Sequence, residues 1–271
     1  MKNSQLSIIK HVPNYLAFCE VEKGLSPITT LNYHNFLLVF IRWLKSQNLT
    51  DLKPHELTPD HIWNYRLYLS RKKNNSEYIK KTTQNYYLIA LRNILNYFAS
   101  KDIISLPAEK VGLPKLTDKD KKIKFLNLDQ VNKLLEIPNI KSKVGLRDRA
   151  ILEALFSSGM RISELVSLNI RQFNKNNLAS GKFTEQELSI VGKGGRRRPV
   201  YFCNRALVWL GRYLATRNDM NTPLFINYDK KNNEGEPRLT THSIDRIVRK
   251  YSTMAGLPVD ATPHTLRHSF A

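Results

Sequence analysis

A stretch without hydrophobic periodicity divides this chain, and this division constrains the fold more than any other feature. Residues 106–124, LPAEKVGLPKLTDKDKKIK, combine prolines, a glycine and a run of charges. This composition is typical of an inter-domain linker, although an ordinary exposed loop has the same letters. With 271 residues, 41% of them hydrophobic, the chain has material for two cores. We therefore expect one domain over residues 1–105 and a second over 125–271.

Residues 1–105 show the apolar spacing and the start signals of helices. Ser26 and Thr58 each precede a proline at the position where a helix begins, and a proline there loses no hydrogen bond. Apolar residues continue at helical spacing after both starts. Short loops between such segments predict a small helical bundle. The expected helices run over 6–18, from Pro27 to about 44, from Pro59 to a polar break at 72–76, and over 78–100.

The second part combines helices with one hairpin. Helical spacing predicts helices near 128–135 and 146–158, from 162, and near 206–214, 240–256 and from 263 onward. The segment ELSIVGKGGRRRPVYF alternates at Leu188 and Ile190, and again at Pro199 and Tyr201, around a Gly194-Gly195 turn. That pattern indicates a β-hairpin. The fold class we expect is mainly α with a small β-sheet: a helical bundle followed by an α+β domain.

The net charge is the first indication of function. The chain has 43 Lys and Arg against 23 Asp and Glu, a formal charge of +20. Both parts are basic, which suits a protein that grips a polyanion from two sides and favours nucleic acid, although ribosome-bound and membrane-surface proteins are also basic. On the last predicted helix of the bundle, four polar residues suit contacts to phosphates and base edges, or a plain solvated face. They are Lys80, Lys81, Asn85 and Arg92.

Candidate catalytic residues cluster in three motifs of the second part. Arg161 lies on the opening turn of a helix, where an arginine is well placed to clamp a phosphate, and Glu164 shares its face. Read without context, the two form a routine surface ion pair. Lys193 stands at the hairpin tip, followed by Arg196, Arg197 and Arg198, of which the first two are candidate DNA contacts. The last motif, TPHTLRHSFA, begins a helix at a proline and carries His264, Arg267 and His268.

Several other site classes are disfavoured. The glycines of the hairpin do not form G-x-x-x-x-G-K-[ST] and open no helix, so a nucleotide-binding loop is excluded. His264 and His268 are one helical turn apart but lack the glutamate of H-E-x-x-H, and Cys19 and Cys203 have no partners in sequence, so we expect neither a metal nor a cofactor. No apolar run approaches 20 residues and no secretory signal begins the chain, which favours a soluble, cytoplasmic protein without a membrane partner.

Together the motifs resemble the tyrosine recombinases, or phage-type integrases, and most of all their Xer-type members. SSGMRISELVSL, VGKGGRRRPV and TPHTLRHSFA occur in the order and at the spacings of that family. The resemblance implies a SAM-like helical core-binding domain and a catalytic domain clamped around duplex DNA. It implies that Arg161 and Arg267 hold the scissile phosphate, that Glu164 supports Arg161, that Lys193 protonates the leaving 5′ oxygen, and that His264 is the general acid/base.

The resemblance also implies partners and a nucleophile. The expected partner is double-stranded DNA with an inverted-repeat recombination site, on which dimers to tetramers assemble, in association with a bacterial nucleoid. The family's nucleophilic tyrosine follows the His264 motif, whereas all twelve tyrosines here precede it. We therefore expect a catalytic domain that is incomplete at its C-terminus and a polypeptide that binds DNA without cleaving it. A DNA-binding accessory protein or repressor, and a type IB topoisomerase, stay open as alternatives.

Overall fold

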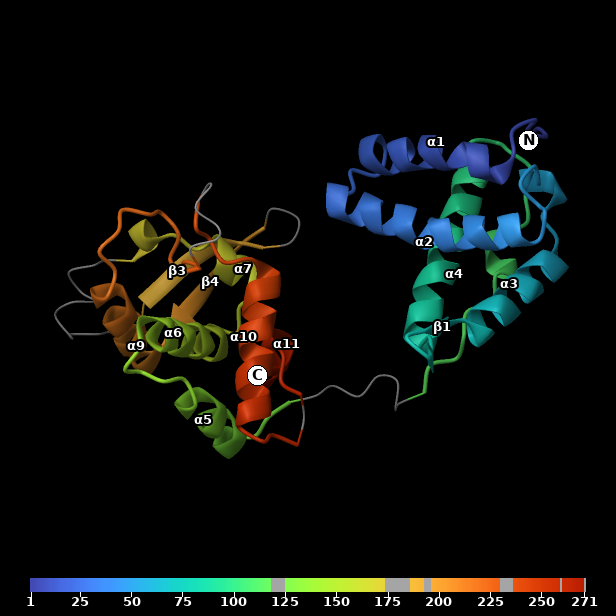
Figure 1. Ribbon diagram of the computed structural model, residues 1–271. Coiled ribbons are helices and arrows are strands. Elements are labelled where there is room, and N and C mark those ends of the chain that lie inside the picture. The colour runs from blue at the N-terminus through green and yellow to red at the C-terminus, as the bar shows by residue number, and fades with distance from the viewer. Residues whose placement is uncertain (118–124, 174–185, 193–195, 230–235, 259, 271) are drawn as a thin grey trace. The chain divides into compact units, whose positions relative to one another are not determined.

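The protein folds into two compact units, each with its own hydrophobic core (Figure 1). The computed structural model describes residues 1–117, 125–173, 186–192, 196–229, 236–258 and 260–270. The units are Met1–Lys122 and Ile123–Ala271. None of the helices within the described ranges is long and apolar enough to cross a bilayer.

The first unit is a four-helix bundle, as the sequence predicts. Ser26 accepts a hydrogen bond from the Thr29 N–H and Thr58 accepts one from the His61 N–H, so both predicted helix starts are confirmed. The short 3-10 helices η1 and η2 follow α2 and α4, and a hairpin with strands of two residues each lies between α3 and α4. The elements are α1 (Ile8–Val21), α2 (Pro27–Ser46), η1 (Pro54–Glu56), α3 (Pro59–Arg71), β1 (Lys73–Asn74), β2 (Glu77–Tyr78), α4 (Lys81–Ser100) and η2 (Ala108–Lys110).

The hairpin β1–β2 was not expected, and it moves the start of α4. Lys73 pairs with Tyr78, and Asn74 pairs with Glu77. The turn between them places Asn75 and Ser76 at φ +47° and +72°. No apolar alternation marks these two-residue strands, so the sequence shows only a polar break there. Because Tyr78 belongs to β2, α4 begins three residues later than predicted.

The segment after α4 packs on the first unit. Ala108 and Val111 are buried in its core, and the Arg92 Nε donates to the Ala108 carbonyl at 3.1 Å. The first half of the predicted linker is therefore attached to the bundle. The limits of the linker itself stay a prediction.

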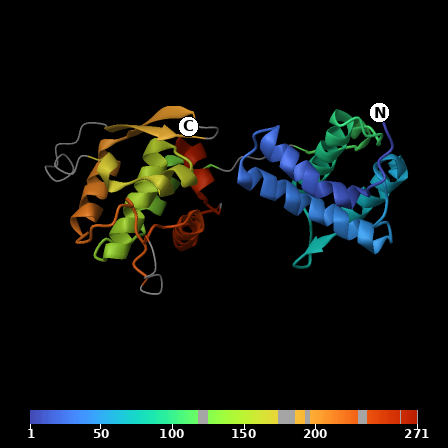
Figure 2. The same cartoon turned by 90° about the horizontal axis from the view of Figure 1, so that it is seen from above.

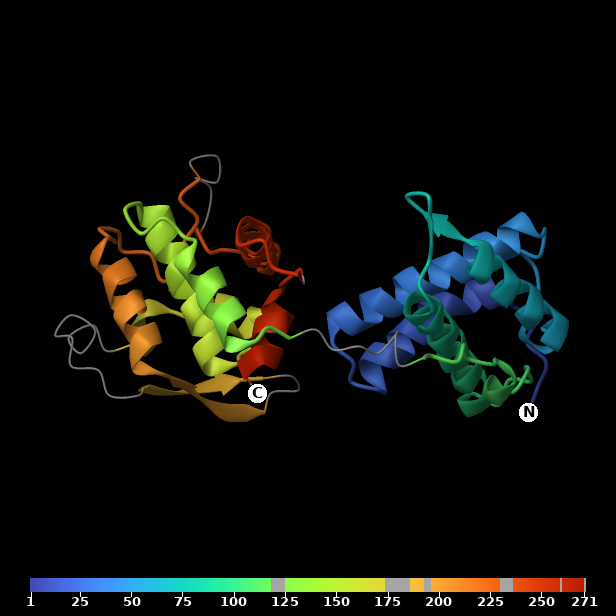
Figure 3. The same ribbon diagram turned by 90° about the horizontal axis from the view of Figure 1, so that it is seen from below.

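In the second unit, helices surround the long helix α6 (Figures 2 and 3). α6 packs against α9, α11 and β4, and Ala150, Ile151 and Leu155 on it have no exposed surface. Gly159, at φ +54°, ends α6 as predicted. The elements are α5 (Leu128–Glu136), α6 (Lys143–Ser158), α7 (Ile162–Ser167), η4 (Ile170–Gln172), β3 (Gln186–Val191), β4 (Arg197–Phe202), α9 (Asn204–Ala215), α10 (Thr241–Met254) and α11 (Pro263–Phe270).

The predicted β-hairpin is present, but the inward face of its second strand differs from the alternation read in the sequence. Leu188 pairs with Val200 in the antiparallel register, and both side chains are buried. Pro199 and Tyr201, which the sequence pattern emphasised, are exposed. Directly opposed residues of an antiparallel pair lie on the same face, so the register with β3 fixes which residues of β4 point inward. The turn residues Gly194 and Gly195 lie outside the described residues.

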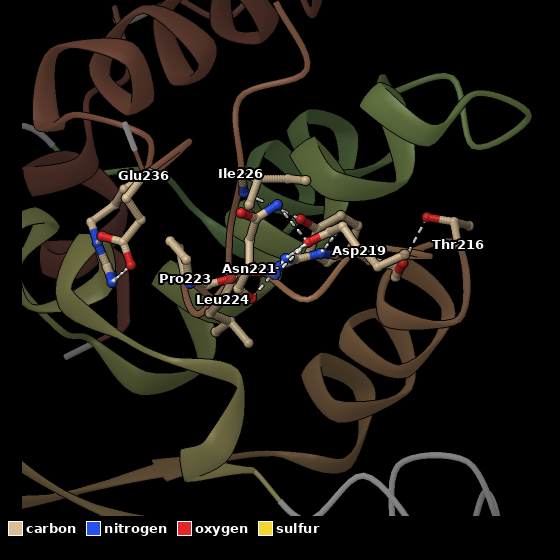
Figure 4. A network of polar contacts seen from close by, with 10 residues as sticks. Thr216, Asp219, Asn221, Pro223, Leu224, Ile226 and Glu236 are labelled. Carbon is tan, nitrogen blue, oxygen red and sulfur yellow. Dashed lines mark hydrogen bonds and ion pairs between the residues drawn. The ribbon is translucent and has the colours of Figure 1, made fainter. Parts of the chain in front are cut away.

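Residues 216–224, which follow α9, are held by a network of polar contacts that includes Asp219, Asn221, Pro223 and Leu224 (Figure 4). The Arg217 side chain is only 2% exposed, and it donates to both carboxylate oxygens of Asp219 and to the carbonyls of Asn221, Pro223 and Leu224. Irregular chain inside a domain must satisfy its backbone polar groups, and here one guanidinium does so for three carbonyls. This arginine fixes the chain from Asp219 to Leu224.

Candidate active site

Arg161 lies at the junction between α6 and α7, and Glu164 holds it at two points. The Arg161 backbone N–H donates to Glu164 Oε2 at 2.7 Å, and its Nη1 donates to Oε1 at 3.0 Å. The carboxylate thus occupies a backbone donor that a bound anion would otherwise use. The Arg161 side chain remains 43% exposed, while that of Glu164 is 4% exposed. Glu164 therefore orients the Arg161 guanidinium through one edge, and the rest of the guanidinium is accessible to a ligand.

Arg238 holds the other end of α7. Its Nη1 donates to the carbonyls of Val166 and Leu168, and its Nη2 donates to Asn169 Oδ1. The last carbonyls of a helix have no partner within the helix, and a basic side chain satisfies them. Both ends of the short helix that follows Arg161 are therefore fixed.

Arg198, from β4, provides a third hydrogen bond to the Glu164 carboxylate. Its Nη2 donates to Glu164 Oε2 at 2.9 Å. The register places Arg198 opposite Ile190, on the inward face of the hairpin. The sequence analysis selected Arg196 and Arg197, which are exposed, and did not select Arg198 as a site residue. The signal that finds it is the period of two that joins Arg198 to the buried Val200.

The carboxylate of Glu164 is kept ionised by these contacts. Burial disfavours its charge, but hydrogen bonds from the Arg161 backbone, the Arg161 side chain and Arg198 outweigh burial and lower its pKa from the ordinary value. A buried carboxylate facing two guanidiniums is a stable anchor for both.

Arg267 approaches the same cluster from α11. The start of this helix is confirmed: Thr262 Oγ1 accepts from the Thr265 N–H, and Pro263 occupies the first turn. Burial first, and then the charges of Arg161 and Arg198, lower the pKa of Arg267. Arg267 Nη1 is buried and has no hydrogen-bond partner among the described residues. A buried donor needs a partner, so this guanidinium has donor capacity to offer an anionic ligand.

The entrance to the hairpin lies beside the same carboxylate. A Cβ added to Gly192 would lie 3.4 Å from Glu164 Oε1 and 3.9 Å from Arg161 Nη1. Lys193 is the next residue in the chain, and it lies outside the described residues. The hairpin therefore begins its turn at the arginine cluster.

Both histidines of α11 are exposed. His264 lies on the first turn and shares a helix face with Arg267, three residues further on, whereas His268 lies on the next turn. Within the described part of the chain, no three His, Cys, Asp or Glu side chains gather into a metal-binding group.

The candidate DNA contacts of the first unit fall into two groups. Lys80 and Lys81 are exposed at the start of α4. Arg92 is half-buried and bound to Ala108, and Asn85 has a buried Oδ1 without a partner among the described residues. The lysines are free to contact a phosphate, while Arg92 already has a structural contact.

The arginine cluster suits one kind of ligand. Arg161 and Arg198 both bind the Glu164 carboxylate, and Arg267 is close enough to interact electrostatically with all three. Three guanidiniums beside one carboxylate leave a surplus of positive charge that suits a tetrahedral oxyanion. In a sheltered site such donors stabilise the charge that develops on a phosphoryl group. The cluster therefore defines an anion site that suits a phosphoryl group.

The comparisons with known proteins identify the class of this protein. The chain belongs to the phage integrase family: residues 124–271 match the Phage integrase family, and residues 12–101 match the Phage integrase, N-terminal SAM-like domain. A relative from Pelobacter propionicus, named Tyrosine recombinase XerC, is 32% identical over 97% of this chain and 81% of its own length. The expected recognition and fold class are thereby confirmed.

Solved structures share the fold. A lambda integrase (75–356) dimer bound to a COC' core site superposes with a TM-score of 0.70 at 13% identity, over 98% of this chain and 88% of that chain. A lambda integrase tetramer bound to a Holliday junction gives a TM-score of 0.68 at 14% identity, over 98% and 72% of the two chains.

Proposed function

We propose that this protein is a site-specific DNA recombinase that breaks and rejoins strands through a 3′-phosphotyrosyl intermediate. Its membership of the tyrosine recombinase family supports this proposal. The single observation that carries it is the cluster of Arg161, Arg198 and Arg267 around Glu164, with an unpaired buried donor on Arg267.

In the proposed reaction a tyrosine oxygen attacks the phosphorus, and the bond from phosphorus to the 5′ oxygen breaks. Arg161 and Arg267 stabilise the charge that builds on the non-bridging oxygens, without moving during the reaction. Lys193 supplies the proton that the 5′ oxygen needs as it leaves, and His264 accepts the proton of the attacking hydroxyl. Rejoining runs through the same steps in reverse.

We propose further that a polypeptide of residues 1–271 binds DNA without cleaving it. The last tyrosine before the His264 motif, Tyr251, is buried and donates to Asp148 Oδ2 at 2.9 Å. Burial and the Asp148 charge raise the pKa of its hydroxyl, which opposes a nucleophilic role. Tyr251 is therefore not the proposed nucleophile.

The proposed partner is duplex DNA with an inverted-repeat site, on which the protein assembles as a dimer and then a tetramer. Lambda integrase, which shares the fold, has been solved as a dimer on a core site and as a tetramer on a Holliday junction. The proposed DNA contacts are Lys80 and Lys81 on the first unit, and Arg196, Arg197 and His268 on the second. This function places the protein on the nucleoid in a bacterial cytoplasm.

The test begins with a DNA site. Selection of bound duplexes from a random pool defines it, and a nicked suicide substrate of that sequence then traps any covalent intermediate. A polypeptide that continues past residue 271 is expected to form a covalent adduct and exchange strands, and residues 1–271 are expected to bind without an adduct. Binding alone in both proteins would instead support an accessory protein or repressor, and relaxation without exchange would support a topoisomerase.

A further inference from the structure

Arg198 is placed to act on the phosphate site through Glu164. Its Nη2 lies 2.9 Å from Glu164 Oε2, and 35% of its side chain is exposed, against 4% for the carboxylate. It reaches the site from β4, whereas Arg161 and Glu164 belong to the junction of α6 and α7. Arg198 therefore connects two elements at one buried carboxylate.

The carboxylate is gripped on both oxygens. Glu164 Oε1 accepts from Arg161 Nη1, and Oε2 accepts from both the Arg161 N–H and Arg198 Nη2. A carboxylate bound through one oxygen rotates about its terminal torsion, because that torsion is broad. Arg161 itself supplies one bond to each oxygen, and Arg198 supplies the bond that ties the carboxylate to a second element, β4. The position of Glu164 fixed in this way sets the plane of the Arg161 guanidinium.

Arg198 also has donor capacity left over. Its Nε is buried and has no hydrogen-bond partner among the described residues, as is also the case for Arg267 Nη1. Both orphaned donors belong to guanidiniums close enough to interact electrostatically. Two unpaired donor atoms on neighbouring guanidiniums are suited to bind the same anion.

We propose that Arg198 is a positioning residue of the phosphate site, which holds Glu164 so that Glu164 presents Arg161 to a DNA phosphate. The identity of the anion rests on the proposed function, but the ordering of Arg161 by Arg198 does not. A residue that acted only through its charge would change anion affinity without changing the order of Arg161.

The chain supplies a matched control. Arg197 precedes Arg198 on β4, carries the same charge and is exposed. Arg198→Gln and Arg197→Gln therefore remove equal charge from one strand, and only the first removes a bond to Glu164. Arg198→Lys keeps a positively charged hydrogen-bond donor but loses the planar guanidinium with its fixed set of donors.

The experiment measures two quantities on residues 1–271: the sharpness and exchange rate of the Arg161 Nε–H signal by ¹H–¹⁵N NMR without ligand, and the dissociation constant for inorganic sulfate. We expect Arg198→Gln to broaden the Arg161 signal and to weaken sulfate binding about tenfold, since a hydrogen bond to a charged group is lost. Arg197→Gln, which removes the same charge but no bond to Glu164, leaves the signal sharp, and the change it causes in sulfate affinity measures the effect of charge alone. Arg198→Lys recovers most of both losses.

An Arg161 signal as sharp in Arg198→Gln as in Arg197→Gln overturns the inference. A sharp Arg161 signal in Arg198→Lys together with unrestored sulfate affinity also overturns it, because order and affinity would then be uncoupled. Should Arg198→Gln fail to fold by circular dichroism, Arg198→Met against Arg197→Met carries the same comparison, because methionine keeps a long side chain but donates no hydrogen bond to Glu164. Failure of the proposed function looks different: sulfate binding and Arg161 order follow Arg198 as described, but no DNA adduct forms.

Discussion

The ring of Phe270 lies where a β-carbon on Gly159 would have to be placed. A Cβ built on Gly159 would lie 2.6 Å from Phe270 Cδ1, well inside van der Waals contact. Gly159 ends α6 two residues before Arg161, and Phe270 follows Arg267 by three residues on α11. The contact therefore joins the two elements that carry the arginines.

Gly159→Ala is predicted to destabilise the second unit and to uncouple Phe270. Positive φ costs a non-glycine residue about 1 kcal/mol, and displacement of the ring adds to that cost. Gly256→Ala is the control, because Gly256 has φ +58° and nothing within 4 Å of its Cβ position. In urea unfolding, Gly159→Ala costs more than Gly256→Ala, and Phe270→Ala then costs nothing further in the Gly159→Ala background. Equal costs for the two alanine variants would refute the contact.

Glu164→Gln is predicted to lower the free energy of unfolding by about 2 kcal/mol, the scale of hydrogen bonds to a charged group. The amide keeps the volume but removes the charge, so Arg161 and Arg198, whose side chains are 43% and 35% exposed, lose the buried counter-ion that both bind. Glu236→Gln is a matched control, because Glu236 pairs with Arg238 but its side chain is 47% exposed, and surface pairs contribute little. Urea unfolding at neutral pH measures both. A loss of similar size in the two variants would show that Glu164 is an ordinary surface charge.

Asp219 is predicted to make stability depend on pH at the acid end. Hydrogen bonding to Arg217 lowers the pKa of Asp219 to about 2, below its ordinary value. A carboxyl whose pKa is lower in the folded state stabilises the protein above the unfolded pKa, and this contribution is lost as the pH falls through the folded pKa. Thermal unfolding between pH 5 and about 2 should therefore show a shallower decline in Asp219→Asn than in the wild-type protein. Identical slopes would show that Asp219 does not contribute to the pH dependence of stability.

Arg92 and Lys81 are predicted to have different roles although both were selected from the sequence as DNA contacts. Arg92→Ala loses the bond to the Ala108 carbonyl and should cost about 1 kcal/mol of stability in the first unit. Lys81→Ala should leave stability unchanged and lower the salt dependence of DNA binding by about one phosphate contact. Urea unfolding and DNA titrations at several salt concentrations separate the two. The reverse pattern would restore Arg92 as a DNA contact.

Local signals in the sequence were enough to locate most helices. Ser26, Thr58 and Gly159 act through their own backbone and nearest neighbours, so their effects are visible in a short window. The pairing of Arg161 with Glu164 is local in the same way, because residues three positions apart lie on the same face of a helix.

Contacts between distant segments could not be predicted in this way. The inward direction of Arg198 depends on its register with β3, and the contact of Arg92 depends on a segment that folds back sixteen residues later. The approach of Arg267 to Arg161 depends on packing of α11 against α6. The resemblance to a family supplied that last relationship, because the residues themselves contain no local signal for it.

The central claim is that Arg161 and Arg267 hold one DNA phosphate, and a double-mutant cycle tests it most directly. The affinity of wild-type protein and of Arg267→Ala is measured for the selected duplex with the scissile phosphate intact or replaced by a neutral methylphosphonate. If Arg267 contacts that phosphate, the two changes are strongly non-additive, and Arg267→Ala loses little further affinity on the neutral duplex. Losses that add in full would show that the arginine and the phosphate do not meet, and would contradict the account.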